Sequence, residues 1–349
     1  MVNYQHRIDL VSDYLVKSGL SGEVGSWFDG KNILVTGGAG AIGSNLVIAL
    51  SVLVGDRGKV VVLDNLSSIK EKNPWNIAPL GNIMFVEGDI RSDIDLKRVF
   101  KEDISIVYHL AAFFANQNSV DWPEKSADVD ILGIIRILEY ARLAKVDRFV
   151  YASSGCAIYG SYGQMPLRED FISMHLTTPY QVNKMAGEMY CNFYYHHYEL
   201  PIVNCRFFNS YGPGEVPGQY RNVVPNFIQK ALIGENIIIT GTGDETRDFT
   251  YISDNIDLLL LLAYSSYSKA EVFNGGTGKK ISIRVLAEMI IKYTNSKSTI
   301  IYAKPRNWDH VKDRCADNKK SKALLGYDPK VDFEEGLMKT IEWIKSKQP

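Results

Sequence analysis

The sequence predicts an α/β fold in which a doubly wound parallel sheet carries a smaller C-terminal α/β lobe. Three observations support this prediction. Short apolar runs alternate with amphipathic stretches through residues 31–205, a pattern typical of parallel strands that are joined by helices and buried on both faces. A glycine-rich segment directly follows the first of these runs. After about residue 210, Gly- and Pro-rich loops separate helices from short strands.

The elements follow in order from the N-terminus. Residues 1–30 form an extension whose apolar residues at helical spacing predict a helix that ends near Gly19. A first domain covers residues 31–205. Its expected strands are residues 32–37, 59–64, 83–89, 105–112 and 148–154. Its clearest helices are expected over about 42–53 and 125–145. We place the smaller lobe mainly in residues 206–349, at the carboxyl edge of the sheet, with the chain crossing back to that sheet.

Composition and charge indicate a soluble globular protein. Of the 349 residues, 46% are hydrophobic and 23% are charged. A net charge of −1 gives no general attraction to nucleic acid or to an anionic membrane. The most apolar run, residues 258–263, is far shorter than the roughly 20 residues that span a bilayer. Four cysteines without metal-like spacing, and an N-terminus without a secretory pattern, predict reduced thiols, no metal site and a cytoplasmic location.

The glycine-rich segment predicts a dinucleotide site. Gly37, Gly40 and Gly43 lie between a strand and a helix, where small residues let the backbone approach a pyrophosphate at the helix N-terminus. Asp64 ends the next strand, 21 residues after Gly43, and can accept hydrogen bonds from ribose hydroxyls. Because its charge would repel a 2′-phosphate, the pattern favours NAD over NADP on a Rossmann-type domain. The expected cofactor contacts are Gly37, Gly40, Ala41, Ile42, Gly43, Asp64, Asn65, Asp89, Ile90, Leu110, Ala111, Ala112, Tyr180 and Lys184.

A tyrosine and a lysine one helical turn apart are the candidate catalytic pair. Tyr180 and Lys184 lie at i and i+4, hence on one face of a helix. The lysine charge is expected to lower the pKa of the phenol from about 10, so that the phenolate can take a proton from a sugar hydroxyl while hydride leaves the same carbon. Ser154, 26 residues upstream at a strand end, is expected to hold the same substrate oxygen.

These features together resemble the extended short-chain dehydrogenase/reductases, in particular NAD-dependent nucleotide-sugar epimerases and dehydratases such as the UDP-sugar 4-epimerases. The resemblance covers about residues 31–345. Besides Asp64, its carriers are VTGGAGAIG, GDI, HLAA, FVYASS, YQVNK, RFFNSYGPG, RDFTYISD, FNGGTG and RCADNKKSKALLGY. It implies bound NAD, a nucleotide-sugar substrate, a homodimer built through a four-helix bundle and, by analogy, a setting in polysaccharide biosynthesis.

The resemblance also implies substrate contacts in the second lobe. Asn209, Arg247 and Arg306 would contact the diphosphate, and Asp309 the nucleotide ribose. Val224, Pro225 and Phe227 would line the nucleobase. Arg314 occupies the area where galactose epimerases often carry a bulky tyrosine, and an arginine there could bind the diphosphate or a sugar carboxylate.

The loop SSGCAIYG, residues 153–160, bears on the reaction. Dehydratases of this family resemble the pattern Thr-Asp-Glu here, and UDP-glucuronate decarboxylases Ser-Glu, whereas no carboxylic acid follows Ser154 in this loop. This favours epimerisation at C4 through a transient 4-keto sugar. A dehydratase or decarboxylase with acids from elsewhere, such as Glu169 or Asp170, is the alternative, and a non-catalytic NAD-sensing protein is a remote one.

Three departures from the family pattern stand out. The 153–160 loop has one extra residue, so that Gly155 takes the place of the serine when the loop is matched from its far end. We place the serine at Ser154, because a strand fixes register better than a loop. Asp130 and Ile134 replace an asparagine and a threonine of the family. The N-terminal extension resembles that of some UDP-N-acetylhexosamine 4-epimerases, which hints at an N-acetylated or uronic sugar.

Overall fold

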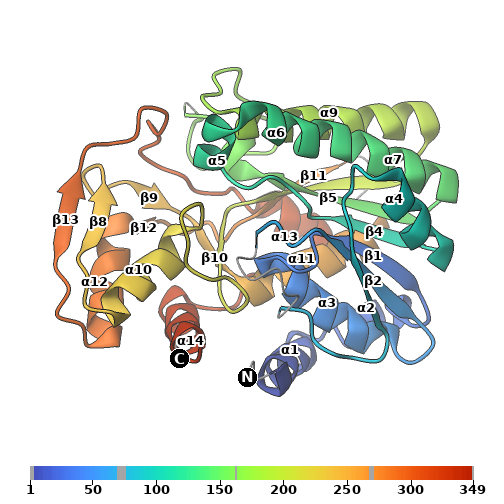
Figure 1. The fold of residues 1–349 in the computed structure, drawn as a ribbon, viewed down its shortest axis with the longest axis horizontal. Coiled ribbons are helices and arrows are strands. Elements are labelled where there is room, and N and C mark those ends of the chain that lie inside the picture. The colour runs from blue at the N-terminus through green and yellow to red at the C-terminus, as the bar shows by residue number, and fades with distance from the viewer. Residues whose placement is uncertain (1–3, 69–75, 162, 267–270, 348–349) are drawn as a thin grey trace.

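The large layer of the molecule is a seven-stranded parallel sheet (Figure 1). The computed structural model describes residues 4–68, 76–161, 163–266 and 271–347. Every pair of neighbouring strands is parallel. Across the sheet the strands are β3 (Ile83–Glu87), β2 (Lys59–Asp64), β1 (Asn32–Thr36), β4 (Ile106–His109), β5 (Arg148–Ser154), β6 (Ile202–Phe207) and β11 (Val272–Gly275). The chain reverses its direction of travel across the sheet between β1 and β4, which is where doubly wound folds bind ligands.

Helices cover both faces of this sheet, as the alternating pattern predicts (Figure 1). One face carries α4 (Asp93–Val99), α7 (Gly133–Ala144) and α9 (Pro179–Tyr198), and the other carries α3 (Ala41–Val54) and α11 (Ile252–Tyr264). Consecutive residues of β2 enter opposite cores: Val60 and Val62 pack on the α3 side, and Val61 and Leu63 on the α4 and α7 side. Burial on both sides explains why the strands read as continuous apolar runs.

The smaller lobe packs beyond the carboxyl ends of the strands and has a core of its own. Parallel β8 and β13 form one small sheet and antiparallel β9 and β12 another. Its elements are α10 (Val223–Leu232), β8 (Ile237–Thr240), β9 (Thr246–Arg247), β12 (Ile281–Ser282), α12 (Ile283–Thr294), β13 (Ile300–Ala303) and α14 (Phe333–Lys345). A short parallel pair, β7 (Asn209–Tyr211) and β10 (Phe249–Tyr251), leads into it. Although α11 and β11 follow residue 206, they pack in the large layer.

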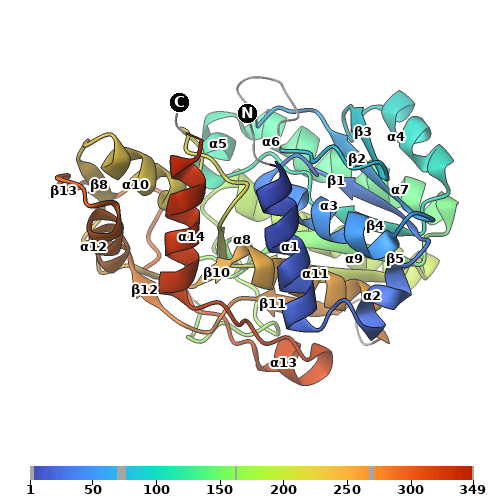
Figure 2. The ribbon, with the colours of Figure 1, turned by 90° about the horizontal axis from the view of Figure 1, so that it is seen from below.

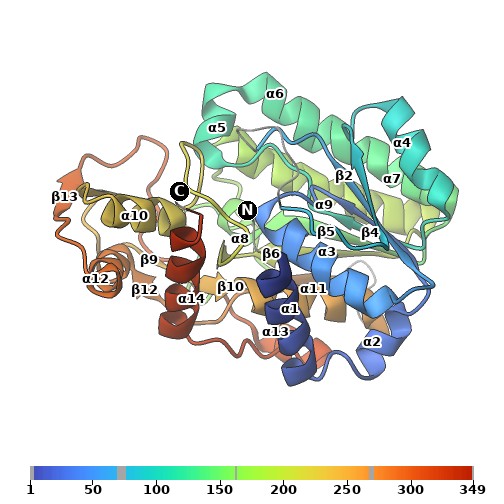
Figure 3. The ribbon, with the colours of Figure 1, turned by 60° about the horizontal axis from the view of Figure 1, so that its bottom comes forward.

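The N-terminal extension folds as two helices against the α3 side of the molecule. α1 (Tyr4–Ser18) packs on α3 and α11, and α2 (Glu23–Phe28) packs beside them. Gly19, at φ +79°, ends α1 where the sequence predicts. Figures 2 and 3 place α1 next to α14, so the first and last helices lie side by side.

Most predicted elements match within two or three residues, and one differs. The helix expected over 125–145 is divided: α6 (Pro123–Ala127) passes through a π-helical turn (Asp128–Leu132) into α7. Three short elements, α5 (Asn116–Asp121), α8 (Gly155–Ile158) and α13 (Lys319–Leu325), complete the helices discussed below. In the described part of the chain, no helix is long and apolar enough to cross a membrane.

Candidate active site

One cavity of about 830 Å³ lies at the carboxyl ends of the central strands, between the sheet and the smaller lobe. Most residues that the sequence predicts for the site line it. From the large layer these are Gly37, Gly40, Ala41, Ile42, Gly43, Asp64, Asn65, Asp89, Ile90, Leu110, Ala111, Ala112, Ser154, Tyr180 and Lys184. From the second lobe and its connections they are Asn209, Phe227, Arg247, Arg306, Asp309 and Arg314.

Two predicted contacts do not line the cavity. Val224 is 1% exposed and packs in the core of the smaller lobe, and Pro225 is likewise buried in α10. The face of α10 that lines the cavity instead carries Val223, Asn226, Phe227 and Lys230. These positions have the three- and four-residue spacing of one helix face, but spacing alone does not say which face of α10 meets the cavity.

The glycine loop has the geometry that a dinucleotide pyrophosphate needs. Gly37 has φ +70°, and a Cβ on it would lie 2.6 Å from the amide nitrogen of Ala111. A Cβ on Gly43 would lie 2.3 Å from the carbonyl oxygen of Gly37. Because side chains are excluded at both positions, the loop and the start of α3 leave their backbone open to a ligand.

Asp64 is held in place by the same loop. One of its carboxylate oxygens accepts a hydrogen bond from the Ala39 amide at 2.9 Å, and the other from the Leu66 amide at 2.8 Å. Burial raises the pKa of this carboxyl group, and the two amides oppose that rise. The carboxylate thus stands at the end of β2 beside the glycine loop, where the sequence places a ribose-binding acid.

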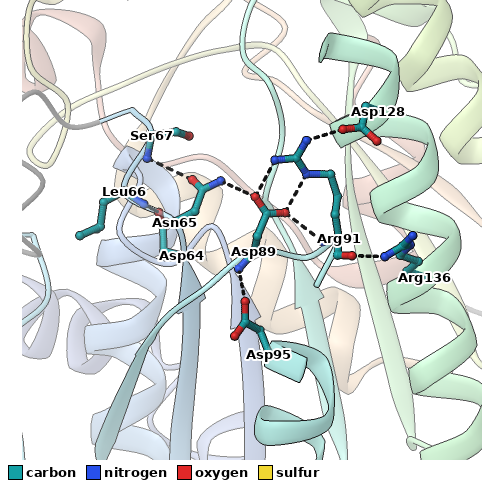
Figure 4. Close-up of polar contacts among 9 residues, drawn as sticks. All are labelled: Asp64, Asn65, Leu66, Ser67, Asp89, Arg91, Asp95, Asp128 and Arg136. Atoms are coloured by element: carbon teal, nitrogen blue, oxygen red, sulfur yellow. Dashed lines mark hydrogen bonds and ion pairs between the residues drawn. The ribbon is translucent and has the colours of Figure 1, made fainter. Parts of the chain in front are cut away.

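A charged cluster builds the far end of the cofactor region (Figure 4). Arg91 donates to both oxygens of Asp89, at 2.9 and 2.8 Å, and also pairs with Asp128. Asn65 donates to Asp89 at 2.9 Å. These contacts lower the pKa of Asp89 to about 2, chiefly through Arg91, so it is ionised at neutral pH. Arg91 is not among the residues predicted from the sequence, although its place two residues after Asp89 in the GDIR segment was a visible signal.

α9 positions the candidate catalytic pair. The side chain of Thr178 caps the helix by accepting from the Gln181 amide at 3.4 Å, and Pro179 occupies its first position. Tyr180 therefore starts the helix and Lys184 follows one turn later. The Nζ of Lys184 lies 5.8 Å from the centre of the Tyr180 ring and donates to the carbonyl oxygen of Ala152 at 2.7 Å.

Ser154 is the last residue of β5, and its side chain lies close enough to Tyr180 to lower the pKa of the phenol. The structure thus brings Ser154, Tyr180 and Lys184 together at one end of the cavity. Gly155 begins α8 and packs tightly: a Cβ on it would lie 2.6 Å from the ring of Phe208. The serine hydroxyl therefore comes from the strand side of the loop.

The pKa of Tyr180 departs from the expected direction. Burial raises it above its ordinary value, and the nearby Asp130 raises it further. Burial also lowers the pKa of Lys184. In this structure the net pKa of the phenol is raised, because desolvation of the phenolate dominates. The expected lowering by Lys184 stays a prediction.

Asp130 is a buried carboxyl group behind the catalytic pair. It accepts hydrogen bonds from the Phe113 amide at 2.7 Å and from the Ser126 hydroxyl at 3.2 Å, and it is 5% exposed. Burial raises its pKa, and Lys184 opposes that rise. Asp130 is not among the residues that line the cavity.

The two acids considered as alternative catalytic groups point elsewhere. Glu169 accepts a hydrogen bond from the Asn274 amide at 2.9 Å, and Asp170 pairs with Arg168 at an exposed position. Neither lines the cavity. Among the described residues, the carboxylates that do line it are Asp64, Asp89, Glu215, Glu245 and Asp309.

Three arginines provide the positive charge of the second-lobe side. Arg247 lies 3.5 Å from Asp309 and also donates to the carbonyl oxygens of Thr246 and Val311. The guanidinium of Arg306 lies 5.5 Å from the ring centre of Trp308. Arg314 is 6% exposed and donates to the carbonyl oxygen of Gly160 at 3.3 Å, and its buried Nε has no hydrogen-bond partner among the described residues.

Comparisons with known proteins agree with these features. Residues 33–276 match the model of the NAD dependent epimerase/dehydratase family. A putative UDP-glucose 4-epimerase from Methanocaldococcus jannaschii is 37% identical over 315 residues, covering 90% of this chain and 98% of that protein. The structure of an epimerase from Methanothermobacter thermautotrophicus is 46% identical, with a TM-score of 0.90 over 94% of this chain and 96% of that one.

Other relatives differ in reaction and substrate. They include a dTDP-D-glucose 4,6-dehydratase from Bos taurus, 34% identical over 90% of this chain and 89% of that protein. A structurally similar UDP-glucuronic acid 4-epimerase from Bacillus cereus was solved with UDP-glucuronic acid and NAD, and has a TM-score of 0.81 and 30% identity over 90% of this chain and 99% of that one. These matches, together with the sequence motifs and the parallel sheet, show that the chain belongs to the NAD-dependent epimerase/dehydratase family.

Proposed function

We propose that this protein epimerises a nucleotide sugar, a UDP-sugar, at C4. The observation that carries the proposal is the Ser154–Tyr180–Lys184 group at a cavity end whose catalytic loop offers no carboxylic acid. Oxidation at C4 needs one base for the hydroxyl proton. Elimination of water across C5 and C6 needs a further acid and base near the same carbon atoms.

The chain's own residues have distinct tasks in this reaction. Tyr180 takes the proton of the C4 hydroxyl, and Ser154 holds the oxygen by its hydroxyl group. Lys184, fixed by the carbonyl oxygen of Ala152, keeps its ammonium near the phenol and favours the phenolate. NAD, when bound, supplies the hydride acceptor and a cationic ring whose charge favours the phenolate. The 4-keto sugar turns over, takes the hydride back on the opposite face of C4, and regains the hydroxyl proton from Tyr180.

A 4,6-dehydratase or a decarboxylase is the second candidate, because relatives with both activities match this chain. The hydrogen bond of Glu169 to the Asn274 amide and the exposed ion pair of Asp170 disfavour this candidate, since neither acid lines the cavity.

We further propose that the sugar carries a carboxylate, as in UDP-glucuronate. Arg247 and Arg306 are the expected diphosphate contacts. Arg314 lies by the catalytic loop, and its buried Nε has no hydrogen-bond acceptor among the described residues. Burying a guanidinium without an anion costs free energy that a bound carboxylate would offset. The bound UDP-glucuronic acid of the Bacillus cereus epimerase is consistent with this choice.

The decisive experiment is proton NMR of the purified protein with UDP-glucose, UDP-N-acetylglucosamine and UDP-glucuronate in turn, without added cofactor. A new anomeric signal with the small H3–H4 coupling of an axial 4-hydroxyl is expected. A 6-deoxy-4-keto product, or loss of the carboxylate, would instead establish the second candidate.

We also propose a homodimer formed by α7 and α9. On α9, Val182, Met189 and Phe193 are about half exposed and share one helix face, since they are four and seven residues apart. On and next to α7, Leu132 and Leu143 are 50% and 62% exposed. Large apolar side chains gathered on adjacent helices are typical of an interface.

A further inference from the structure

The N-terminal extension places a buried positive charge directly behind the glycine loop. Arg7, on α1, is 1% exposed. Its Nη2 donates to the hydroxyl of Ser44 at 3.0 Å, and Ser44 follows Gly43 in the first turns of α3. Among the described residues, no carboxylate pairs with Arg7.

A second contact extends this support to the loop itself. The Nη1 of Arg7 donates to the side-chain oxygen of Asn76 at 2.7 Å and to its carbonyl oxygen at 3.2 Å. Asn76 in turn donates to the carbonyl oxygens of Ala39 at 3.2 Å and Gly214 at 2.9 Å. The guanidinium of Arg7 therefore contacts the start of α3 directly, and through Asn76 it is linked to the glycine loop and to the loop after β7.

The C-terminal helix completes the enclosure. The ring centre of Trp343 on α14 lies 5.3 Å from the guanidinium carbon of Arg7, and Trp343 donates to the carbonyl oxygen of Glu215 at 3.2 Å. Both Arg7 and Trp343 lie outside residues 33–276, where the family model matches. The contact between Arg7 and Trp343 thus joins two segments that flank the matched region.

The charge of Arg7 persists in this environment. Burial lowers its pKa to about 10, with Tyr4 opposing that change, and Lys347 is a further cation nearby. Arg7 is therefore protonated at neutral pH. Burying a cation costs free energy that a nearby anion offsets, and no carboxylate among the described residues does so for Arg7. The nearby N-terminus of α3 also favours an anion at this place.

We propose that Arg7 is a positioning residue for the dinucleotide pyrophosphate: it fixes the glycine loop and contributes a buried positive charge to pyrophosphate binding. The role lies in binding and not in the chemical step. It depends on the NAD site of the family and is independent of which sugar the protein converts.

The test compares ADP, which carries a pyrophosphate, with adenosine, which does not. Protein stripped of cofactor is titrated with each probe by calorimetry. Arg7→Met, which removes the charge but keeps an unbranched chain, is expected to weaken ADP binding about tenfold or more and to leave adenosine binding within about twofold. Arg7→Lys, which keeps the charge, is expected to retain most of the ADP affinity.

A matched control separates this role from simple docking of α1. Tyr14→Phe removes a second polar anchor of the helix, where the Tyr14 hydroxyl donates to Asp257 at 2.5 Å, and does not touch the glycine loop. It is expected to leave ADP binding unchanged. Equal losses for ADP and adenosine, an equal loss in Tyr14→Phe, or a loss in Arg7→Lys as large as in Arg7→Met would each overturn the proposal. If Arg7→Met does not fold, Arg7→Gln takes its place, because it also removes the charge but keeps a donor for Asn76. A selective loss of ADP affinity in that variant supports the proposal, and unchanged ADP binding overturns it.

Discussion

Tyr180 is the residue on which burial, hydrogen bonding and charge converge. Its hydroxyl meets Ser154, its ring lies near Lys184, and Asp130 acts on it from behind. We expect Tyr180→Phe to lower kcat by about 10³-fold, because the positioned base is lost while the cavity keeps its shape. The measurement is turnover by NMR together with the NAD content of the purified variant. An active variant would show that another group is the base.

Asp130 should set the pH dependence of this base. Its charge raises the pKa of Tyr180, while Lys184 and the Ser126 and Asn183 side chains act on Asp130 itself. In Asp130→Asn the phenol pKa falls, so the acid limb of the kcat/KM profile should move to lower pH. An unchanged profile in a folded, active variant would mean that Asp130 is uncharged in the working enzyme.

Arg314 provides a test of substrate class. Arg314→Met should lower kcat/KM for UDP-glucuronate about 100-fold, the effect of losing a charged hydrogen bond, and leave that for UDP-glucose within about threefold. Initial rates with both sugars give the comparison. Equal losses for the two sugars would assign Arg314 to the diphosphate instead.

At the scale of elements, the docking of α1 on α11 should depend on pH. Asp257, on α11, accepts the Tyr14 hydroxyl, and burial raises its pKa to about 7, above an ordinary value of about 4. The folded state therefore binds this proton more tightly than the unfolded state. The resulting stability is full below about pH 4 and is lost as pH rises through about 7.

We therefore expect the thermal unfolding midpoint to fall between pH 6 and pH 8 in the wild type. Asp257→Asn keeps an acceptor for Tyr14 but cannot ionise, so its midpoint should change less over this range. Differential scanning fluorimetry at both pH values measures the effect. A slope equal to that of the wild type would place the titrating group elsewhere, for example at Glu215, whose pKa is also raised to about 7.

Local sequence patterns predicted the helices, strands and loops that position the candidate site. The features that they did not predict depend on tertiary contacts. The glycine loop, Asp64 and the Tyr180–Lys184 spacing depend on neighbours in sequence, so they could be read directly. The face of α10, which excludes Val224 and Pro225 from the cavity, depends on how that helix rotates against its lobe. The raised pKa of Tyr180 and the burial of Arg7 arise from packing between distant segments.

At the scale of the whole molecule, the exposed apolar face of α9 should determine the oligomeric state. We expect the wild type to sediment near twice the chain mass of 39.2 kDa, and Phe193→Glu to sediment as a monomer. Met338→Glu, at a 43% exposed position on α14, is the matched control and should remain dimeric. A monomeric wild type would refute the dimer.

The adjacent first and last helices have a consequence for engineering. Because α1 and α14 lie side by side, a short linker could join the two chain ends, and new ends could be opened in an exposed loop elsewhere. Such a circular permutant should fold if the linker leaves Arg7 against Trp343. A permutant whose linker displaces that contact should also fold but should lose its cofactor during purification. The design of the linker between the two ends would then control how much cofactor the protein retains.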